Sequence, residues 1–350
     1  MARLRRVDCS GPGIVRRRRG RGWEYIDSET GERIEEPEVI ARIRELAIPP
    51  AWKDVWICAY PMGHIQAIGS DAAGRRQYIY HPKWRERRDQ EKFDHMIEFA
   101  RALPAMRDVW KEHLGLEGMP KEKALACAAR LLDRGFFRIG TEGYAEQNQT
   151  YGLATIQKRH VQLVEGREIV FDYRAKSGKR RIWSIVDDDV YDVVEILKKR
   201  RSGLTELLAY KSGGRWVDVK SSDINAYIKD VSGEDFTAKD FRTWTATVLA
   251  AVGLSVSGQA SRSKTGRTRA ISLVVKEVAH YLGNTPAVCR ASYIDPRVFD
   301  RYRSGWTISG ALEDLGDVDY GEPSYQGAIE LAVLDLLAND RSSDAVEKIA

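Results

Sequence analysis

The sequence has little cysteine and histidine, and neither occurs in the spacing of a metal site. Its 350 residues include four cysteines and six histidines. The cysteines are far apart with no C-x-x-C pair, and the histidines form neither an i, i+4 pair nor an H-E-x-x-H motif. These spacings argue against a zinc knuckle or a disulfide framework, and they indicate a reducing compartment. Because a P-loop is missing as well, we expect no cofactor, neither a metal ion nor ATP.

Long apolar runs are missing too. No stretch approaches the roughly 18 apolar residues that a membrane-spanning helix needs. The basic N-terminus is not followed by the apolar core of a secretion signal. We therefore expect no membrane partner and a cytoplasmic protein associated with the nucleoid.

Acidic residues are outnumbered by basic ones everywhere except at the C-terminus. Residues 308–350 carry ten acidic and two basic side chains, so the rest of the chain carries 54 basic against 41 acidic ones, a net charge of +13. A body this basic repels itself unless a polyanion binds it, and the commonest polyanion is a nucleic-acid backbone. The composition therefore favours a nucleic-acid partner.

Strand patterns dominate the first ninety residues and helical patterns the remainder, which predicts an α+β protein with separate domains. We expect a small N-terminal antiparallel-sheet domain (residues 1–90), a larger, mainly helical domain (residues 91–307) and an acidic tail (residues 308–350). The predicted strands are residues 23–27, 55–60, 64–68, 77–80, 169–173 and 181–186. The predicted helices are residues 37–46, 84–101, 106–113, 121–136, 188–200, 224–231, 239–252 and 271–282.

Four charged segments are predicted to lie outside the folded cores. Residues 1–20, with four consecutive arginines, indicate a mobile basic arm, and residues 255–269 indicate a basic loop that orders on a polyanion. Residues 83–92 are polar on all sides and are the expected hinge between the domains. The tail contains one amphipathic helix, whose apolar stripe we expect to dock on the helical domain. That stripe consists of Ile329, Val333, Leu334 and Leu337.

The most informative stretch is residues 278–296. Apolar spacing predicts a helix ending at Leu282, Gly283 suits a left-handed cap, and Thr285-Pro286 predicts the start of a second helix. Asn284 then lies at the junction, with Tyr293 near the end of the second helix. A phenol there is able to point back towards the amide, although half-buried tyrosines are common for packing alone.

Three cationic residues lie at the ends of predicted elements. Arg138 follows an apolar helix, Arg242 opens another, and Lys176 tips the loop of a predicted β-hairpin whose cations include Lys179 and Arg180. A lone arginine beside an apolar face is more often a surface ion-pair partner than a catalytic group. These three residues indicate a catalytic site only when they are considered together with Tyr293.

Together these segments resemble the poxvirus-like and bacterial type IB DNA topoisomerases. The resemblance rests on F-F-R-I-G-T-E-G-Y (residues 136–144), Y-R-A-K-S-G-K (173–179), K-D-F-R-T-W (239–244) and L-G-N-T-P-A-V-C-R-A-S-Y (282–293). In the N-terminal half, I-P-P-A-W-K-D-V-W-I (48–57) and G-R-R-Q-Y-I-Y-H (74–81) are similar to the DNA-embracing domain of that family. The resemblance covers about residues 21–300 and implies a catalytic domain of the tyrosine recombinase and type IB topoisomerase kind.

The resemblance implies a role for each residue. Tyr293 is the expected nucleophile, Arg138 and Arg242 clamp the phosphate, and Lys176 is the general acid. Viral members of the family have histidine where this sequence has Asn284, so we expect an amide hydrogen bond to the phosphate and a pH profile without a histidine limb.

The chemistry fits these residue types. A phenol has a pKa near 10, so it is a poor nucleophile at neutral pH unless cations stabilise its anion. Two arginines provide that stabilisation and neutralise a five-coordinate phosphorus. We expect the neighbouring cations, among them Arg174, to depress the pKa of Lys176 and suit it to protonate the leaving 5′ oxygen.

DNA contacts are expected from both domains of a monomer that clamps double-stranded DNA. The resemblance implies contacts from Arg75, Gln77, Tyr78 and Tyr80 in the N-terminal sheet and from Tyr144 in the helical domain. We also expect Lys179 and Arg180 of the hairpin loop to contact DNA. The alternative for Tyr78 and Tyr80 is an ordinary half-buried strand.

Two other functions stay open. A tyrosine site-specific recombinase uses the same ordered Arg, Lys, Arg, Tyr set, but it usually has a helical N-terminal domain instead of a sheet. A non-catalytic DNA-binding protein explains the basic charge, although not why Arg138, Lys176, Arg242 and Tyr293 occur together.

Overall fold

The computed structural model describes residues 3–257, 263–315 and 323–349. The chain divides into two compact units, Met1–Phe93 and Asp94–Ala350. The first is built around an antiparallel sheet and the second is mainly helical, so the prediction of an α+β protein is confirmed.

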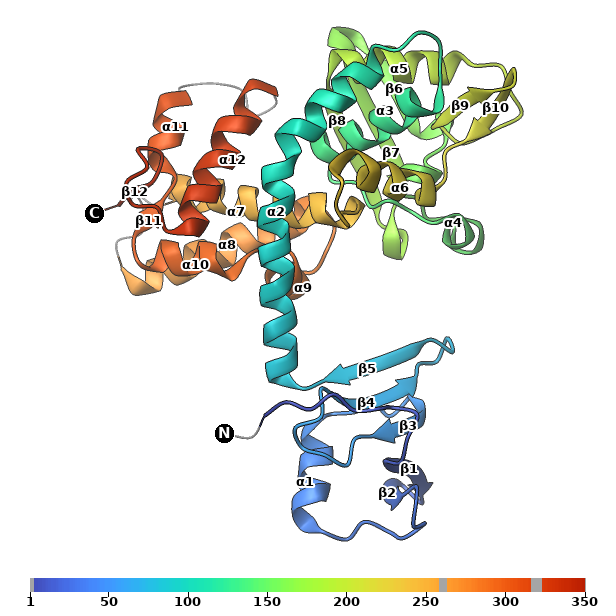
Figure 1. Cartoon of the computed structure of the whole chain (residues 1–350), viewed down its shortest axis with the longest axis vertical. Coiled ribbons are helices and arrows are strands. Elements are labelled where there is room, and N and C mark those ends of the chain that lie inside the picture. The colour runs from blue at the N-terminus through green and yellow to red at the C-terminus, as the bar shows by residue number, and fades with distance from the viewer. Residues whose placement is uncertain (1–2, 258–262, 316–322, 350) are drawn as a thin grey trace. The chain divides into compact units, whose positions relative to one another are not determined.

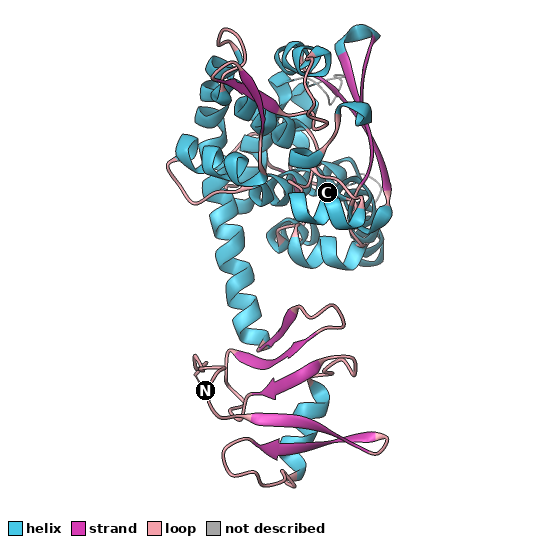
Figure 2. Ribbon diagram, turned by 90° about the vertical axis from the view of Figure 1, so that its right-hand side faces the viewer, coloured by secondary structure: helices cyan, strands magenta, loops and turns pink. Residues whose placement is uncertain are grey.

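The N-terminal unit is a five-stranded antiparallel sheet with one helix, α1 (Pro37–Glu45), against it (Figure 2). The strands follow the spatial order β2-β1-β3-β4-β5. Their bounds are Ile14–Arg19 (β1), Gly22–Asp27 (β2), Lys53–Ile57 (β3), Ile65–Ser70 (β4) and Arg76–Tyr80 (β5). Four of the five were predicted from their alternating pattern, and β5 lies at the edge of the sheet.

The core of this unit is small and apolar. Ile43 of α1 packs with Ile14, Val55, Ile57 and Ala67 from three strands, all of them buried. The α1 helix begins with a proline at its first position and ends before Pro49, as its sequence predicts. One helix face and one sheet face therefore provide the whole core.

The prediction of a mobile basic arm is wrong for the run of arginines. Residues 16–19 lie in β1, which pairs with β2 in a hairpin around Gly20, at φ 56°. The Arg16 guanidinium donates to the carbonyl of Trp52 (2.8 Å) and lies 4.2 Å from the Trp23 ring centroid. Because arginine stems pack on apolar surface while their charges reach polar partners, a charge run can still be a strand.

Residues 83–92 are helical. The structure has one helix, α2 (Pro82–Leu114), where the sequence predicted two, and Pro104 lies inside it. Three ion pairs support its polar first part: Arg87–Glu91, Arg88–Glu91 and Lys92–Asp89. Such i, i+3 and i, i+4 pairs stabilise a helix that is polar on all sides, so the prediction of separate helices is wrong. Of the described residues, no helix is both long and apolar enough to cross a membrane.

The second unit consists of helices and, among its described residues, three small sheets (Figure 1). Its helices after α2 are α3 (Lys121–Arg134), α4 (Glu142–Asn148), α5 (Asp188–Lys199), α6 (Ser221–Ser232), α7 (Ala238–Ser257), α8 (Lys264–Leu282), α9 (Pro286–Ser292), α10 (Pro296–Arg303), α11 (Ser309–Leu315) and α12 (Pro323–Ala338). The predicted helices that became α3, α5 and α6 are confirmed, whereas α4 was not predicted.

The sheets of this unit include the predicted hairpin. Strands β7 (Glu168–Arg174) and β8 (Arg180–Val186) pair antiparallel, with Tyr173 opposite Arg181. They form a three-stranded sheet with β6 (Val161–Val164), which was not predicted. A second hairpin joins β9 (Ala209–Ser212) to β10 (Arg215–Asp218), and β11 (Trp306–Thr307) pairs with β12 (Glu347–Lys348).

The prediction of a long basic loop at residues 255–269 is wrong for the described part of that segment. Helix α7 continues to Ser257, and α8 begins at Lys264 with the Ser263 hydroxyl as its cap. Residues 258–262 lie outside the described residues. Lysine and arginine have high helix propensity, so a basic composition does not end a helix.

The acidic tail is joined to the helical unit, as predicted. Ile329, Val333 and Leu337 of α12 are buried, while Leu334 is half-buried, and α12 lies beside α7 and α10 (Figure 1). The described residues of the tail, 308–315 and 323–349, therefore fold with the second unit.

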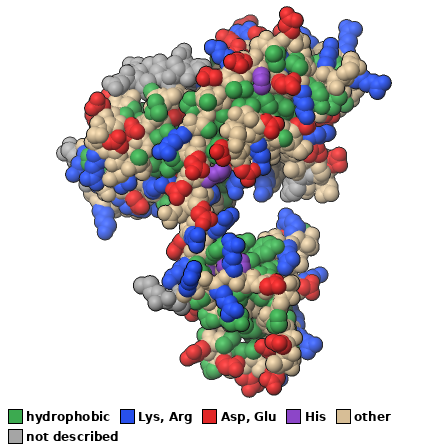
Figure 3. Space-filling model, in the orientation of Figure 1, with side chains coloured by type: hydrophobic (Ala, Val, Ile, Leu, Met, Phe, Trp, Pro, Cys, Tyr) green, Lys and Arg blue, Asp and Glu red, His purple; other side chains and the backbone are tan. Residues whose placement is uncertain are grey.

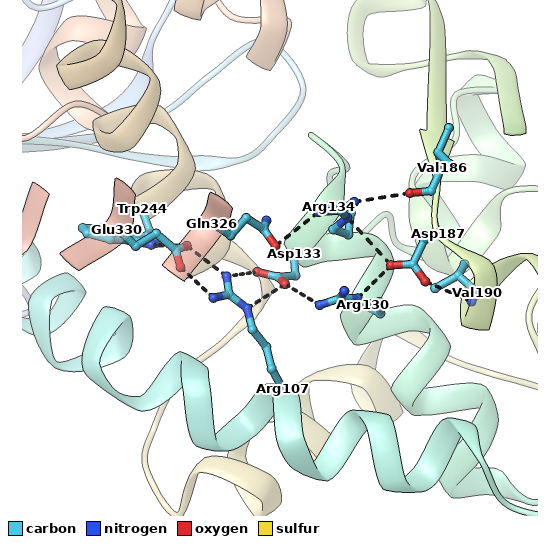
Figure 4. Close-up of polar contacts among 10 residues, drawn as sticks. All are labelled: Arg107, Arg130, Asp133, Arg134, Val186, Asp187, Val190, Trp244, Gln326 and Glu330. Carbon is cyan, nitrogen blue, oxygen red and sulfur yellow. Dashed lines mark hydrogen bonds and ion pairs between the residues drawn. The ribbon is translucent and has the colours of Figure 1, made fainter. Parts of the chain in front are cut away.

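A polar network fixes α12 to three other helices. Glu330 accepts from both terminal nitrogens of Arg107 (2.6 and 2.9 Å) and from the Trp244 indole (2.9 Å). Figure 4 shows Arg107 between Glu330 and Asp133, whose carboxylate it also binds in a bidentate manner (2.8 and 2.9 Å). Since bidentate pairs fix geometry, the tail helix holds α2, α3 and α7 in register.

Candidate active site

The predicted junction between two helices is confirmed at Gly283. Helix α8 ends at Leu282, and Gly283 has φ 66° and ψ 34°, the left-handed cap that glycine adopts without strain. The Thr285 hydroxyl accepts from the Val288 amide (3.3 Å), and Pro286 begins α9. Tyr293 follows the last residue of α9. Local sequence signals thus set the direction in which the chain leaves α8.

Three arginines from separate elements converge on the C-terminal end of α8. Their guanidinium groups donate to its final carbonyls: Arg181 to His280 (2.7 Å) and Tyr281, Arg242 to Leu282 (2.8 Å), and Arg138 to Gly283 (3.5 Å). The last carbonyls of a helix lack intrahelical partners and carry its negative dipole end. The helix end therefore attracts three cations without a carboxylate.

Arg242 is the most deeply buried of the three, with 6% of its surface exposed. Asp240 accepts from both the amide and the hydroxyl of Thr237, and this capping arrangement fixes the first turn of α7. Arg242 also donates to the Phe136 carbonyl (2.7 Å). Burial, and then the charge of Arg138, lower the pKa of Arg242 to about 10. It still carries its charge at neutral pH.

Arg138 is held through its backbone by a close approach of two glycines. Its carbonyl accepts from the Leu153 amide (2.8 Å). Gly140 has φ 77°, and a Cβ on Gly152 would lie 2.5 Å from the Gly140 nitrogen and 2.6 Å from the Arg138 oxygen. Only glycine fits at position 152 without moving this segment.

Asn284 has one end of its amide occupied and the other free. Its Oδ1 accepts a hydrogen bond from Arg138, which fixes the orientation of the amide. Asn284 Nδ2 is buried with no hydrogen-bond partner, and so is Arg242 Nε. Because a buried donor without a partner costs free energy, these two N–H groups are suited to bind an acceptor atom.

Tyr293 and Tyr173 lie near the same arginines, but the pKa values of their phenols shift in opposite directions. Burial raises the pKa of Tyr173 to about 12 against the influence of Arg181, Arg242 and Arg138, and 5% of its surface is exposed. Burial also opposes ionisation of Tyr293, but the charges and hydrogen bonds of Arg242 and Arg138 outweigh it and lower the pKa of that phenol. The Arg242 guanidinium carbon lies 5.4 Å from the Tyr293 ring centroid. Of these two phenols, Tyr293 is the one whose pKa the arginines lower.

In the described part of the chain, no carboxylate forms an ion pair with Arg138 or Arg242. The groups that perturb Arg242 are Arg138, Tyr293 and Tyr173, and both arginines bind carbonyl or amide oxygens as well as the Tyr293 phenol. Carbonyl dipoles stabilise a cation without cancelling its charge. The site therefore keeps a net positive charge for an anion.

Lys176 lies in the tight turn between β7 and β8, where Ser177 and Gly178 have φ 66° and 72°. It is exposed and lines a small recess together with Arg138, Lys179 and Arg181. Arg180 instead pairs with Asp172 (2.8 Å), so one of the like charges expected around Lys176 is compensated. The structure thus brings Lys176 and Lys179 to the edge of the arginine site, whereas Arg180 is held within the hairpin.

The tyrosines predicted to contact DNA in the N-terminal unit lie on one face of β5. Tyr78 and Tyr80 are 42% and 44% exposed, and their rings stack with centroids 6.0 Å apart. They line an open groove of about 770 Å³ together with Trp84, Arg85 and Arg88. Figure 3 shows Lys and Arg side chains gathered around the part of this unit that leads into α2.

Two other predicted contacts lie elsewhere. Gln77 alternates to the opposite side of β5 from Tyr78, and its amide donates to Asp71 (2.9 Å). Arg75 is exposed but pairs with the same carboxylate (2.9 Å). Asp71 therefore holds both side chains. Tyr144 belongs to α4, and its side chain lies outside the described residues.

No three metal-ligating side chains of the described residues come together. The donors that converge at the site are guanidinium and amide N–H groups, which bind anions instead of cations. The arrangement is suited to a phosphate or a similar oxyanion.

Sequence reasoning missed Arg181 and Arg76. Arg181 falls in a predicted strand, and its position against α8, about 100 residues later, depends on tertiary packing that local patterns do not encode. Arg76 shares a face with Tyr78, and its guanidinium carbon lies 5.8 Å from that ring. Alternation along β5 was the signal for Arg76, since residues 76, 78 and 80 must lie on one side.

Comparisons with known proteins show the family of the chain. A family model described as eukaryotic DNA topoisomerase I, catalytic core, matches residues 81–308. A model described as bacterial DNA topoisomerase IB, N-terminal domain, matches residues 22–71. Together the two models cover both units.

Individual relatives point the same way. The chain is 29% identical to DNA topoisomerase 1B of Acanthamoeba polyphaga mimivirus over 297 residues, which is 83% of this chain and 88% of that protein. It is 20% identical to DNA topoisomerase 1B of Vaccinia virus (strain Copenhagen) over 235 residues, 67% of this chain and 71% of the relative. For DNA topoisomerase 1 alpha of Arabidopsis thaliana the identity is 22% over 161 residues, 46% of this chain and 16% of the plant protein.

Replacing Gly152 by alanine should destabilise the protein, because the new methyl group overlaps backbone atoms of Gly140 and Arg138. We expect a loss of about 1–3 kcal/mol in the free energy of unfolding, measured by urea denaturation. Gly143→Ala is the matched control, since a Cβ there meets open space within a helix and alanine favours helix. Equal stability of the two variants would contradict the close packing behind Arg138.

Replacing Arg138 by glutamine should raise the pKa of Tyr293. The arginine favours the phenolate, so its loss moves ionisation to higher pH. The measurement is a pH titration of ¹³C-labelled tyrosine by NMR, with the Tyr293 signal assigned by its loss in Tyr293→Phe. Arg215→Gln, an exposed change on β10, should leave that titration unchanged. A Tyr293 signal that titrates at the same or lower pH in Arg138→Gln would show that the guanidinium does not act on the phenol.

Proposed function

Since the chain belongs to the type IB DNA topoisomerases, we propose that it relaxes supercoils by cutting and resealing one DNA strand through Tyr293. The cut strand is held by a 3′-phosphotyrosine bond while the other end rotates. The observation that carries this proposal is the convergence of two arginines without carboxylate partners on a phenol whose pKa they lower. Such a site is organised for a phosphate that a phenolate attacks.

The first step forms the bond between Tyr293 Oη and phosphorus. The phenol loses its proton to solvent, helped by Arg242 and Arg138, and its oxygen attacks the scissile phosphate. Charge grows on the non-bridging oxygens as phosphorus becomes five-coordinate, and cations already in position stabilise that charge without reorganisation. The same two arginines thus act on the nucleophile and on the phosphate.

Two unpartnered donors are suited to those oxygens. Asn284 Nδ2 and Arg242 Nε are buried and lack an acceptor in the DNA-free protein. A phosphate oxygen at each would remove the cost of burying them. Asn284 then acts as a neutral hydrogen-bond donor, and its amide cannot titrate as a histidine would.

The second half of the step releases the 5′ oxygen, which needs a proton because an alkoxide is a poor leaving group. Lys176 is our candidate for the proton donor, supported by the recess that it shares with Arg138. The P–O5′ bond breaks, O5′ takes the ammonium proton, and the energy of the phosphodiester is kept in the phosphotyrosine. Resealing is the reverse reaction, so we propose that neither ATP nor a metal ion is required.

Duplex binding is proposed to involve both units of one monomer. In the N-terminal unit we assign the exposed Tyr78, Tyr80 and Arg76 face of β5 to the DNA backbone, with stacked rings supporting the hydroxyl groups. Contacts to phosphates release counterions, so binding should weaken steeply with salt. Location in the cytoplasm with the nucleoid stays a prediction.

The direct test is relaxation of a supercoiled plasmid of arbitrary sequence in EDTA without ATP. The wild-type protein should relax it to completion. Tyr293→Phe should show no relaxation, at least about 10³-fold below wild type, because the nucleophilic oxygen is gone. Tyr173→Phe is the matched control and should retain activity, since the Tyr173 phenol stays protonated.

Two results would contradict the proposal. Residual relaxation by pure Tyr293→Phe would exclude Tyr293 as the nucleophile. Failure of the wild-type protein on an arbitrary plasmid, with activity only on DNA that carries paired sites, would favour a site-specific recombinase.

A further inference from the structure

Arg181 joins the Lys176 hairpin to the end of α8. It lies on β8, one pair below the turn, opposite Tyr173. Its guanidinium donates to the carbonyls of His280 (2.7 Å) and Tyr281 on the last turn of α8. A Cβ on Gly283 would lie 3.4 Å from the Arg181 guanidinium carbon, so this side chain packs against the residue that precedes Asn284.

The same contact is extended by aromatic side chains. The Arg181 guanidinium carbon lies 4.5 Å from the centroid of Trp183. Trp183 and Tyr281 stack with centroids 6.0 Å apart, and Phe136 lies against both rings (4.8 and 5.6 Å). Stacked, partly exposed aromatic rings and two charge-assisted hydrogen bonds therefore hold β8 to α8.

The Lys176 turn needs such support, because its own contacts are local. Inside it, Ala175 donates to the Lys179 carbonyl (2.8 Å) and Gly178 to that of Ala175 (3.0 Å). The residues from Lys176 to Arg180 are exposed. A short exposed turn keeps its shape through these bonds, but its place relative to the phosphate site depends on what holds the strands below it.

Arg181 also differs from Arg138 and Arg242 in the partners of its terminal guanidinium nitrogens. Both terminal nitrogens of Arg181 donate to α8 carbonyls, and its guanidinium packs between Gly283 and Trp183. Each terminal nitrogen thus has a backbone partner on α8, and the role that we argue for Arg181 acts through the two elements that it joins.

We propose that Arg181 is a positioning residue for protonation of the leaving 5′ oxygen: by binding the C-terminal carbonyls of α8, it sets the place of Lys176 relative to the phosphate. This inference rests on the proposed function. When Tyr293 attacks, the P–O5′ bond breaks and O5′ takes a proton from the Lys176 ammonium, which becomes a neutral amine. The proton transfer requires hydrogen-bond distance between the nitrogen of one element and an oxygen held by another. Arg181 makes the contact between those elements.

The test compares an oxygen and a sulfur leaving group. A duplex oligonucleotide carries either the normal 5′ oxygen or a 5′-bridging sulfur at the position that the wild-type protein cleaves most. A thiolate is a far weaker base than an alkoxide and leaves without a proton. The measured quantity is the rate of covalent protein–DNA formation in a single turnover.

Arg181→Gln should form the adduct about 10- to 100-fold more slowly than wild type on the oxygen substrate, since small misplacements of a catalytic group cost about that much. On the sulfur substrate the difference should shrink to about threefold or less. Lys176→Ala should show the same pattern, because both variants lose the proton transfer. A side chain that only supports the fold would slow both reactions equally.

Arg167→Gln is the matched control. Arg167 lies just before β7, at the opposite end of the hairpin from Lys176, and pairs with Asp192 on α5 (2.6 Å), away from the site. Its rates should match wild type on both substrates. Arg181→Lys, which keeps one cationic donor, should give an intermediate defect with the same recovery on sulfur, and it replaces Arg181→Gln if that variant melts at a lower temperature.

Equal slowing of Arg181→Gln or Arg181→Lys on both substrates would overturn the proposal, as would a normal rate on the oxygen substrate. Neither result would touch the proposed function. If the wild-type protein formed no adduct with oxygen or sulfur, the proposed function itself would fail, independently of Arg181.

Discussion

The C-terminal end of α8 is the constraint on which the site depends. Carbonyls of four consecutive residues, 280 to 283, accept hydrogen bonds from Arg181, Arg242 and Arg138. Burying a guanidinium costs free energy, and placing Arg242 beside Arg138 adds repulsion, as the lowered pKa of Arg242 reflects. Helix-end dipoles offset these costs without cancelling the charges. A carboxylate in the same position would have neutralised the cations that a phosphate and a phenolate need.

The same helix end also directs the Asn284 amide and the Tyr293 phenol. The left-handed turn at Gly283 brings Asn284 to Arg138, and the Thr285 cap starts the short helix that leads to Tyr293. Thr247 of α7 then binds the Tyr293 carbonyl (3.4 Å) and accepts from the Asp295 amide (3.2 Å). One junction of about ten residues thus sets the cations, the amide and the phenol relative to one another. The wider scaffold, including the Glu330–Arg107 network, keeps the contributing helices in register.

The parts of the fold that sequence predicted are those with local causes. Gly283, Thr285 and Pro286 each specify a backbone geometry, so the junction was predicted to the residue. The hairpin at Lys176 followed from alternation and a glycine-containing turn. The motifs around Arg138, Arg242 and Tyr293 identified the residues that the structure brings together.

The sequence predictions that were wrong concern residues whose partners are distant in the sequence, or segments whose composition suits both a helix and a loop. A run of arginines in β1 hides its alternation, and only the carbonyls near Trp52 and the Trp23 ring show why Arg16 is ordered. Charged residues favour helix as readily as loop, which explains α2 and the start of α8. No local sequence pattern singled out Arg181, because its contacts form only where β8 packs against α8. By contrast, strand periodicity was enough to predict that Gln77 and Tyr78 lie on opposite faces of β5.

The central claim is that one phenol oxygen, set between two carbonyl-bound arginines, carries the DNA strand. The most direct measurement is mass spectrometry of the protein trapped on DNA by denaturation, after nuclease and trypsin digestion. The account predicts a nucleotide remnant joined through its 3′ phosphate to the peptide of residues 291–297, in which Tyr293 is the only tyrosine. A remnant on another peptide, or one joined through a 5′ phosphate, would contradict it.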